Sequence, residues 1–94
     1  MRKNYYREQA RGRECMVRIP GICNHNPETV ILAHLGGAGM GSKRDDRIGA
    51  WCCSDCHDLI DGRRHTNYKR DLLQLWHLEG IIRTQEALIS EGKL

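Results

Sequence analysis

Residues 51–57 read WCCSDCH, and this short stretch contains the pattern that decides the fold. Two residues separate Cys53 from Cys56, a spacing that allows two thiolates to bind one tetrahedral Zn²⁺. Cys56 also falls near the start of a helix expected over residues 54–61, where the partial positive charge of the helix end favours a thiolate. The stretch therefore predicts half of a zinc site.

A second pair of cysteines is available to complete that site. Cys15 and Cys23 flank a β-like run, and the turn signal Pro20-Gly21 between them predicts a hairpin that brings the two sulfurs together. A four-cysteine zinc site contributes about 10–16 kcal/mol of folding free energy in zinc-finger peptides. Cys52 is left over, and we interpret it as a buried small hydrophobe or an incidental thiol. The predicted ligands of structural zinc are Cys15, Cys23, Cys53 and Cys56.

The composition explains why such a site is needed. The chain has 94 residues, of which 39% are hydrophobic, and it contains five cysteines and no Phe. A domain of this size has a small core and benefits from a metal. No apolar run approaches the roughly 18 residues that span a bilayer, and the N-terminal residues lack the apolar region of a secretory signal. We therefore expect a cytoplasmic protein without a membrane partner, in which cysteines bind metal.

The pattern of apolar residues predicts a single α+β domain over residues 1–94. An N-terminal helix is expected within residues 1–12 (at 3–11), and a zinc-stapled core over residues 13–65. The core is expected to hold strands at 29–35 and 48–51, a glycine-rich mobile loop at 36–47 and the helix 54–61. Helices are expected again in residues 66–94.

In this C-terminal part, Thr66 is a good N-cap for a helix through about Leu78, and Gly80 is expected to break or kink the chain before a last helix over 81–91. One apolar face is expected on the first of these helices. We interpret this face as core rather than as a surface that docks a partner, because the chain has few apolar residues. Its members are Leu72, Leu75, Trp76 and Leu78.

Two histidines stand at informative positions. His34 ends the first predicted strand, just before the glycine-rich loop, so its imidazole can face a cleft while the strand holds it. His57 follows the C-x2-C pair, and Asp61 lies four residues further on the same helix face. Such a pair is half of a site for a second metal with open positions, although a structural histidine and a surface polar pair are the simpler interpretations. No role is predicted for His25, His65 or His77.

The charge is concentrated in two basic clusters. Lys and Arg total 15 against 12 acidic residues, which gives a net charge of +3. Residues 1–18 hold six basic and two acidic residues, and residues 63–70 hold four basic residues and no acid. Two such clusters would suit DNA or RNA, but basic helix faces are often only solvated.

The order of these motifs resembles the HNH, or ββα-metal, endonuclease fold on a treble-clef zinc scaffold, over about residues 13–65. The segments GRECMVRIPGICNHNPETVILAHLGG and CSDCHDLIDG resemble more closely the YbcO-like prophage "putative nuclease" family, which is related to Ref-type recombination nucleases. This closer resemblance covers most of the chain. It implies a metal-dependent endonuclease that acts on DNA in phage or prophage recombination or DNA processing.

The resemblance also implies roles for individual residues. His34 matches the general base, and His57 matches a ligand of the catalytic Mg²⁺ or Mn²⁺. Asp61 stands at the second position of an H-x3-H pattern, and Asp46 is a further candidate ligand. The candidate nucleic-acid-binding residues are Arg44, Arg47, Arg63, Arg64, Lys69 and Arg70.

Two other functions remain open at this point. Ala33 stands where many HNH enzymes have a metal ligand just before the catalytic histidine, which favours a non-catalytic zinc module that binds nucleic acid. The third interpretation is a zinc-stabilised module that binds a recombination or replication protein. A homodimer would allow an enzyme of this kind to cut both strands of a duplex.

Overall fold

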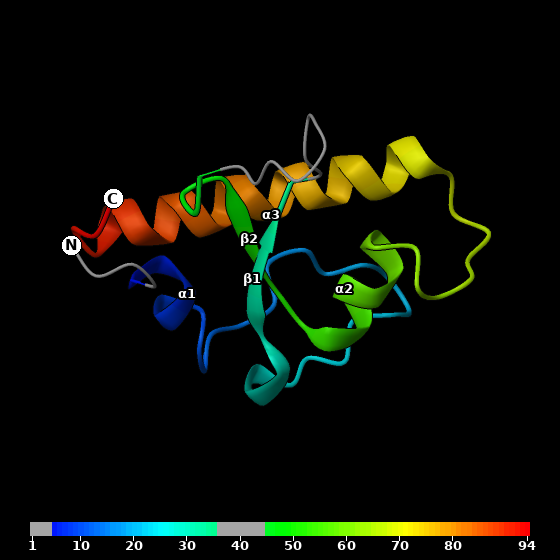
Figure 1. Ribbon diagram of the computed structural model, residues 1–94, viewed down its shortest axis with the longest axis horizontal. Helices are drawn as coiled ribbons and strands as arrows, with labels where there is room; N and C mark the ends of the chain where they lie inside the picture. The colour runs from blue at the N-terminus through cyan, green and yellow to red at the C-terminus, as the bar shows by residue number, and fades with distance from the viewer. Residues whose placement is uncertain (1–4, 36–44) are drawn as a thin grey trace.

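The computed structural model describes residues 5–35 and 45–94 and has the expected α+β composition. Its elements are α1 (Tyr5–Gln9), the 3-10 helix η1 (Pro27–Thr29), β1 (Ile31–His34), β2 (Gly49–Cys52), α2 (Ser54–Ile60) and α3 (Arg70–Ser90). Figure 1 shows α1 and α2 on opposite sides of the two strands, with α3 running across the whole width of the fold.

The two strands form an antiparallel sheet in which Ala33 pairs with Ala50 and His34 pairs with Gly49. Every residue of β2 is buried, because β1 lies on one side of this strand and α3 packs against it. The backbone N–H of Trp51 donates a hydrogen bond of 3.0 Å to the hydroxyl of Thr84 on α3. The sheet is therefore fixed to α3, and the strand that ends in His34 is held in place by its neighbour.

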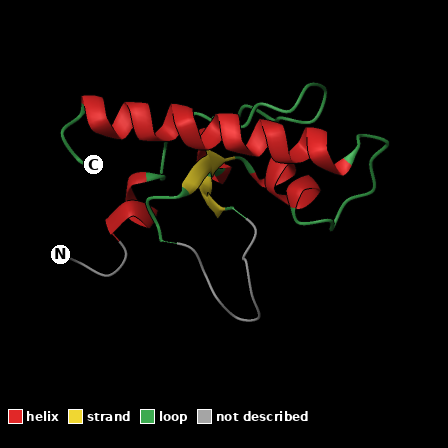
Figure 2. Cartoon of the chain, turned by 90° about the horizontal axis from the view of Figure 1, so that it is seen from above, coloured by secondary structure: helices red, strands yellow, loops and turns green. Residues whose placement is uncertain are grey.

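The C-terminal part of the chain differs from the prediction, because α3 is one helix that passes through Gly80 (Figure 2). A Cβ atom at Gly80 would lie only 2.8 Å from Cγ2 of Val17, so this glycine permits close packing rather than a break. Thr66 is not the N-cap, since Lys69 holds that position. The Thr66 hydroxyl instead accepts a hydrogen bond from the N–H of Tyr68 in the preceding loop.

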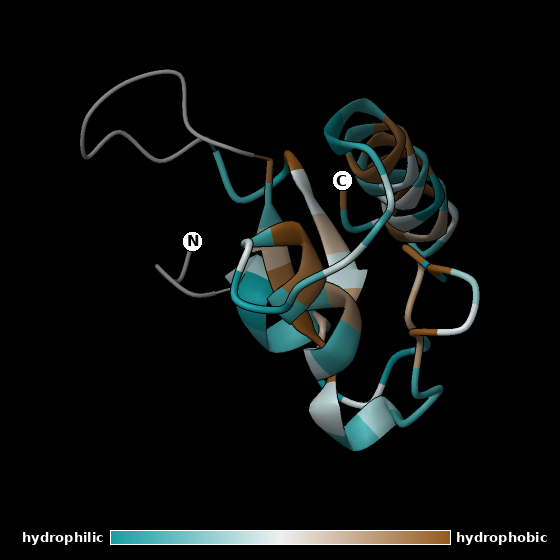
Figure 3. Ribbon diagram, turned by 90° about the vertical axis from the view of Figure 1, so that its right-hand side faces the viewer, coloured by the Kyte–Doolittle hydropathy of each residue, from teal (hydrophilic) through white to brown (hydrophobic). Residues whose placement is uncertain are grey.

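The predicted apolar face of this helix is also wrong. Leu72, Leu75 and Leu78 are 36%, 49% and 39% exposed, and Trp76 is only partly buried. Apolar residues occur on more than one side of α3 (Figure 3), and contact with β2 decides which side enters the core. The buried residues of α3 are Leu73, His77, Gly80, Ile81, Thr84 and Leu88.

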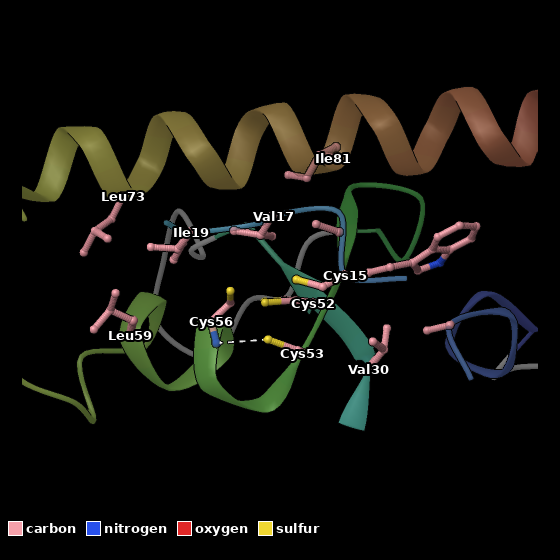
Figure 4. Packing of buried hydrophobic residues seen from close by; sticks show 14 of the residues in the cluster. Cys15, Val17, Ile19, Val30, Cys52, Cys53, Cys56, Leu59, Leu73 and Ile81 are labelled. Carbon is pink, nitrogen blue, oxygen red and sulfur yellow. Dashed lines mark hydrogen bonds between the residues drawn. The ribbon is translucent and has the colours of Figure 1, made fainter. Parts of the chain in front are cut away.

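The segment between the first two cysteines forms a turn without the expected hairpin strands. The backbone N–H groups of Ile22 and Cys23 both donate to the carbonyl of Ile19, at 3.1 and 3.0 Å, and Gly21 has a φ of 74°. The turn at Pro20-Gly21 is thus confirmed, whereas residues 15–23 contain no strand. Val17 and Ile19 enter the core from this segment (Figure 4).

The other predicted elements are confirmed, three of them in shortened form and the second strand shifted by one residue. The strands predicted at 29–35 and 48–51 are β1 and β2, and the helix predicted at 54–61 is α2. The helix predicted at 3–11 is α1, and Gly12 follows it with a φ of 74°. Most of the predicted glycine-rich loop, residues 36–44, lies outside the described residues, as does Arg44. No helix in the described ranges 5–35 and 45–94 is both long and apolar enough to cross a membrane.

Candidate metal centre and histidine site

The four predicted cysteines come together at the start of α2. Their sulfur atoms all lie within 4.8 Å of one another, and the Sγ atoms of Cys23 and Cys53 are 3.9 Å apart. Tetrahedral Zn²⁺ with Zn–S bonds of about 2.3 Å places neighbouring sulfurs about 3.8 Å apart. The cysteines therefore fit a structural zinc ion and could hold such a metal. They are Cys15, Cys23, Cys53 and Cys56.

Local backbone geometry points the sulfurs inward. Cys53 is the N-cap of α2, and its Sγ accepts a hydrogen bond of 3.4 Å from the backbone N–H of Cys56. The Nδ1 atom of His25 lies 3.6 Å from Cys23 Sγ. Hydrogen bonds of this kind stabilise thiolates and orient metal ligands.

The titration of the sulfurs is consistent with a cation between them. Hydrogen bonds with the thiols of Cys52 and Cys56 lower the pKa of Cys15. Burial raises the pKa of Cys23 to about 11, and the hydrogen bond with Cys15 raises the pKa of Cys56. The raised pKa values of Cys23 and Cys56 mean that these two thiols lose their protons more easily beside a positive charge. A bound Zn²⁺ would supply that charge, because thiols that coordinate zinc are deprotonated.

Cys52 is buried, as one of its two predicted interpretations requires, with 0% of its surface exposed. Figure 4 shows its sulfur beside those of Cys15 and Cys56, yet it is not part of the four-sulfur group. Hydrogen bonds with Cys15 and Cys56, together with burial, strongly raise the pKa of Cys52. It is therefore a buried thiol that packs beside the candidate metal ligands.

The histidine at the end of β1 faces a carboxylate. His34 Nε2 lies 2.6 Å from Oδ1 of Asp46, which belongs to the turn before β2. Both side chains are about four-fifths buried, at 20% and 22% exposure. The second oxygen of Asp46, Oδ2, lies 3.6 Å from Nε of Arg7 on α1. Arg7 was not among the predicted site residues, because only the folded chain brings α1 beside β1.

His57 and Asp61 form the predicted pair on one face of α2. The distance from His57 Nε2 to Asp61 Oδ2 is 3.2 Å, and Arg63 Nη2 lies 3.5 Å from the same oxygen. Within the described residues, the four cysteines are the group of three or more His, Cys, Asp or Glu side chains that lie close enough to share an ion. His57 and Asp61 are thus two candidate metal-ligating side chains, and Asp46 contacts His34 instead of joining them.

A third histidine lies behind β1. His77 is 2% exposed, and its Nε2 lies 2.9 Å from the carbonyl oxygen of Ala33, the residue before His34. Burial lowers the pKa of His77, and the charges of His57, Asp61 and His34 act on it as well. The three histidines therefore occupy one region of the molecule. The sequence signal for His77 is its spacing from Leu73, Gly80 and Ile81, the buried residues of α3.

The predicted nucleic-acid-binding residues in the described ranges are all exposed, but several pair with acids. Arg47 Nη2 lies 2.8 Å from Asp45, which lowers the pKa of that carboxyl, and Arg64 lies 3.4 Å from Asp55. Arg63 contacts Asp58 and Asp61, and Arg70 donates to the carbonyl of Ile60 at the end of α2. Of these residues, Arg63 is linked to His57 through the carboxylate of Asp61, which both side chains contact.

A small α+β fold with four clustered cysteines defines a class of proteins in which a metal-binding centre could take the place of a larger core. The sequence model of the family described as "Putative nuclease YbcO" matches residues 4–93, so the chain belongs to the YbcO family.

Proteins similar to this chain share almost its full length. "Putative nuclease YbcO" of Escherichia coli (strain K12) is 49% identical over 92 residues, and "Putative nuclease ybcO" of Enterobacteria phage 82 matches equally well. Each match covers 92% of both chains. A solved structure, "Structure of a putative bacteriophage protein from Escherichia coli str. K-12 substr. MG1655", matches with a TM-score of 0.81 and 45% identity. The match covers 94% of this chain and 100% of the chain in the solved structure.

Proposed function

We propose that this protein is an HNH-like endonuclease that hydrolyses DNA phosphodiester bonds with a divalent metal, on a structural zinc scaffold. The observation that carries the proposal is the contact between His34 and Asp46 at the end of β1, in a chain whose family is described as a nuclease. A histidine held by a carboxylate is a common arrangement for a general base.

The geometry supports a specific role for each nitrogen of His34. Its Nε2 faces Asp46 at 2.6 Å, so in the proposed tautomer the Nε2–H group donates a hydrogen bond to the carboxylate. The Nδ1 lone pair is then available to accept a proton from a water that attacks phosphorus. In this proposal Asp46 orients the base, which differs from the metal-ligand role suggested by the sequence.

His57 and Asp61 would hold the divalent metal on α2. A bound Mg²⁺ or Mn²⁺ supplies positive charge that stabilises the pentacovalent phosphate and the leaving oxygen. The basic residues that follow α2, up to the first residue of α3, would bind neighbouring phosphates without reading sequence. These residues are Arg63, Arg64, Lys69 and Arg70, and Arg47 would approach the DNA from the turn before β2. Arg44, the remaining predicted DNA-binding residue, lies outside the described residues.

The zinc centre serves the site through α2. Cys53 and Cys56 fix the first turn of the helix that carries His57, while the other two cysteines tie this turn to residues 15–23. Positioning by a rigid scaffold is what a catalytic pair needs, because small displacements of reacting groups are costly.

A plasmid-nicking assay with Mg²⁺, Mn²⁺, Zn²⁺ and no added metal tests the proposal. We expect metal-dependent nicking that falls by at least about 10²-fold in His34→Ala. The matched control is His65→Ala, because His65 is exposed in the loop before α3. Nicking that survives in His34→Ala would contradict the assignment of the base. Sedimentation of the same samples with and without DNA shows whether the active species is a homodimer.

The second candidate is a zinc module that binds nucleic acid, or a recombination protein, without cleaving. The buried Ala33 favours it, because this position is 2% exposed and carries no metal ligand beside His34. Salt-dependent DNA binding without cleavage under any metal would support this candidate.

A further inference from the structure

Arg7, on α1, contacts the carboxylate that also contacts His34. Its Nε lies 3.6 Å from Asp46 Oδ2, and the other oxygen of that carboxylate lies 2.6 Å from His34 Nε2. Arg7, Asp46 and His34 thus form a continuous chain of polar contacts from α1 to the end of β1.

The short helix that carries Arg7 is fixed to the rest of the fold. Tyr6 is 9% exposed, and its hydroxyl donates a hydrogen bond of 2.8 Å to the carbonyl of Lys93 near the C-terminus. Ala10, one turn further on, is fully buried at 0% exposure. These contacts hold α1 beside β1, so the position of Arg7 is set by packing.

A role in stability alone does not account for this arginine. The Arg7 side chain is 46% exposed, and an ion pair at that exposure adds little to folding stability. The guanidinium is nevertheless a planar fork of donors that matches two phosphate oxygens, and half of the side chain faces solvent beside the proposed base.

We propose that Arg7 binds the phosphodiester group that is attacked at His34. This inference rests on the proposed function. As the oxygen of water forms its bond to phosphorus, its proton passes to Nδ1 of His34, and Arg7 donates hydrogen bonds to the non-bridging oxygens as their charge increases. The bond from phosphorus to the leaving oxygen then breaks, and that oxygen takes a proton from solvent.

In this arrangement α1 is part of the active site. Asp46 has two functions, since one oxygen orients His34 and the other holds Arg7 until a phosphate replaces it. Donors that strengthen their contacts in the transition state act on kcat, whereas uniform phosphate contacts act on KM.

The test compares Arg7→Gln with Arg11→Gln in the zinc-loaded protein, on supercoiled plasmid with the activating metal. Arg11 is exposed in the same segment, so both variants lose one positive charge. We expect Arg7→Gln to lower kcat by about 10²-fold with a change in KM of about threefold or less. Arg11→Gln is expected to keep kcat within about threefold of the wild type. The kcat of Arg7→Lys is expected to lie between those of Arg7→Gln and the wild type, because lysine keeps the charge and loses the planar pair of donors.

Each outcome is decisive. A cleaving wild type with an Arg7→Gln variant of normal kcat would overturn the inference and leave the proposed function standing. A wild type that does not cleave under any metal overturns the proposed function and the role of Arg7 with it. Zinc content and the melting temperature are measured on every variant. A kcat loss accompanied by a lowered melting temperature or zinc loss, and not restored in part by Arg7→Lys, would show that Arg7 is only structural and overturn the inference.

Discussion

The cysteine centre and the His34 site are built in opposite ways. The centre has four ligands of one kind within 4.8 Å of one another, three of them on buried residues. The His34 site consists of separate pairs, His34 with Asp46 and His57 with Asp61, whose side chains are 20–36% exposed. Closed ligand sets are typical of structural zinc, and open ones leave room for water and substrate. In the proposed function, the cysteine centre stabilises the fold and the His34 site carries the chemistry.

Removal of a zinc ligand should give the largest effect on the molecule. We expect Cys53→Ala to lose zinc and to unfold at room temperature, because the metal replaces core that a chain of 94 residues lacks. Metal analysis and circular dichroism measure both changes. The matched control is Cys52→Ala, a neighbouring buried cysteine outside the four-sulfur group, which should keep one zinc per chain at a cost of about 1 kcal/mol.

The comparison would fail if the two cysteine variants behaved alike. Zinc loss in Cys52→Ala would mean that this thiol is a ligand in solution. A folded, zinc-free Cys53→Ala would mean that apolar packing alone holds the domain together.

The next largest effect is expected at the His34 site. Asp46→Asn keeps the size of the side chain but removes the carboxylate proposed to accept a hydrogen bond from Nε2 of His34. We therefore expect nicking to fall by about 10²-fold. The unfolding free energy should change by less than about 1 kcal/mol, because the residue is partly exposed.

The control for this variant is Asp45→Asn. Its carboxylate contacts Arg47 rather than a histidine, so nicking should stay within about threefold of the wild type. Equal activity losses in the two variants would remove the special role of Asp46 and weaken the distinction between the regions.

The sequence predicted the cysteine centre better than the His34 site, and the reason is physical. The C-x2-C spacing is a local constraint, and the remaining distant pair completes a tetrahedral ligand set. The contacts of His34 depend on how β1, α1 and the turn before β2 pack, so the sequence supplied the histidine and left the role of Asp46 open. Arg7 was visible only as one of several basic residues.

The apolar face of α3 shows the same limit in the core. Leu75 and Leu78 repeat at helical spacing, and so do Leu73, Ile81 and Leu88, so periodicity permits two faces. Contact with β2 and with Val17 chooses the second one. Gly80 was predicted to break the helix because local sequence does not show its tight contact with Val17. That contact comes from a segment more than 60 residues away in sequence.

The smallest expected effect is a pH dependence at the boundary between the two regions. Burial lowers the pKa of His77 below the ordinary value of 6.5. The unfolded chain therefore binds a proton at a higher pH than the folded chain does, so this histidine contributes stability above about pH 6.5 and loses it as the pH falls through the folded-state pKa.

The variant His77→Gln tests this expectation, because it keeps a donor for the Ala33 carbonyl and cannot titrate. Urea unfolding at several pH values should show a shallower loss of stability in His77→Gln than in the wild type. His65→Gln, at an exposed position, should follow the wild type, because protonation of zinc-bound thiolates affects all three proteins alike. If wild type and His77→Gln lose stability in parallel as the pH falls, His77 does not contribute to the acid sensitivity. The sensitivity would then come from the cysteine centre.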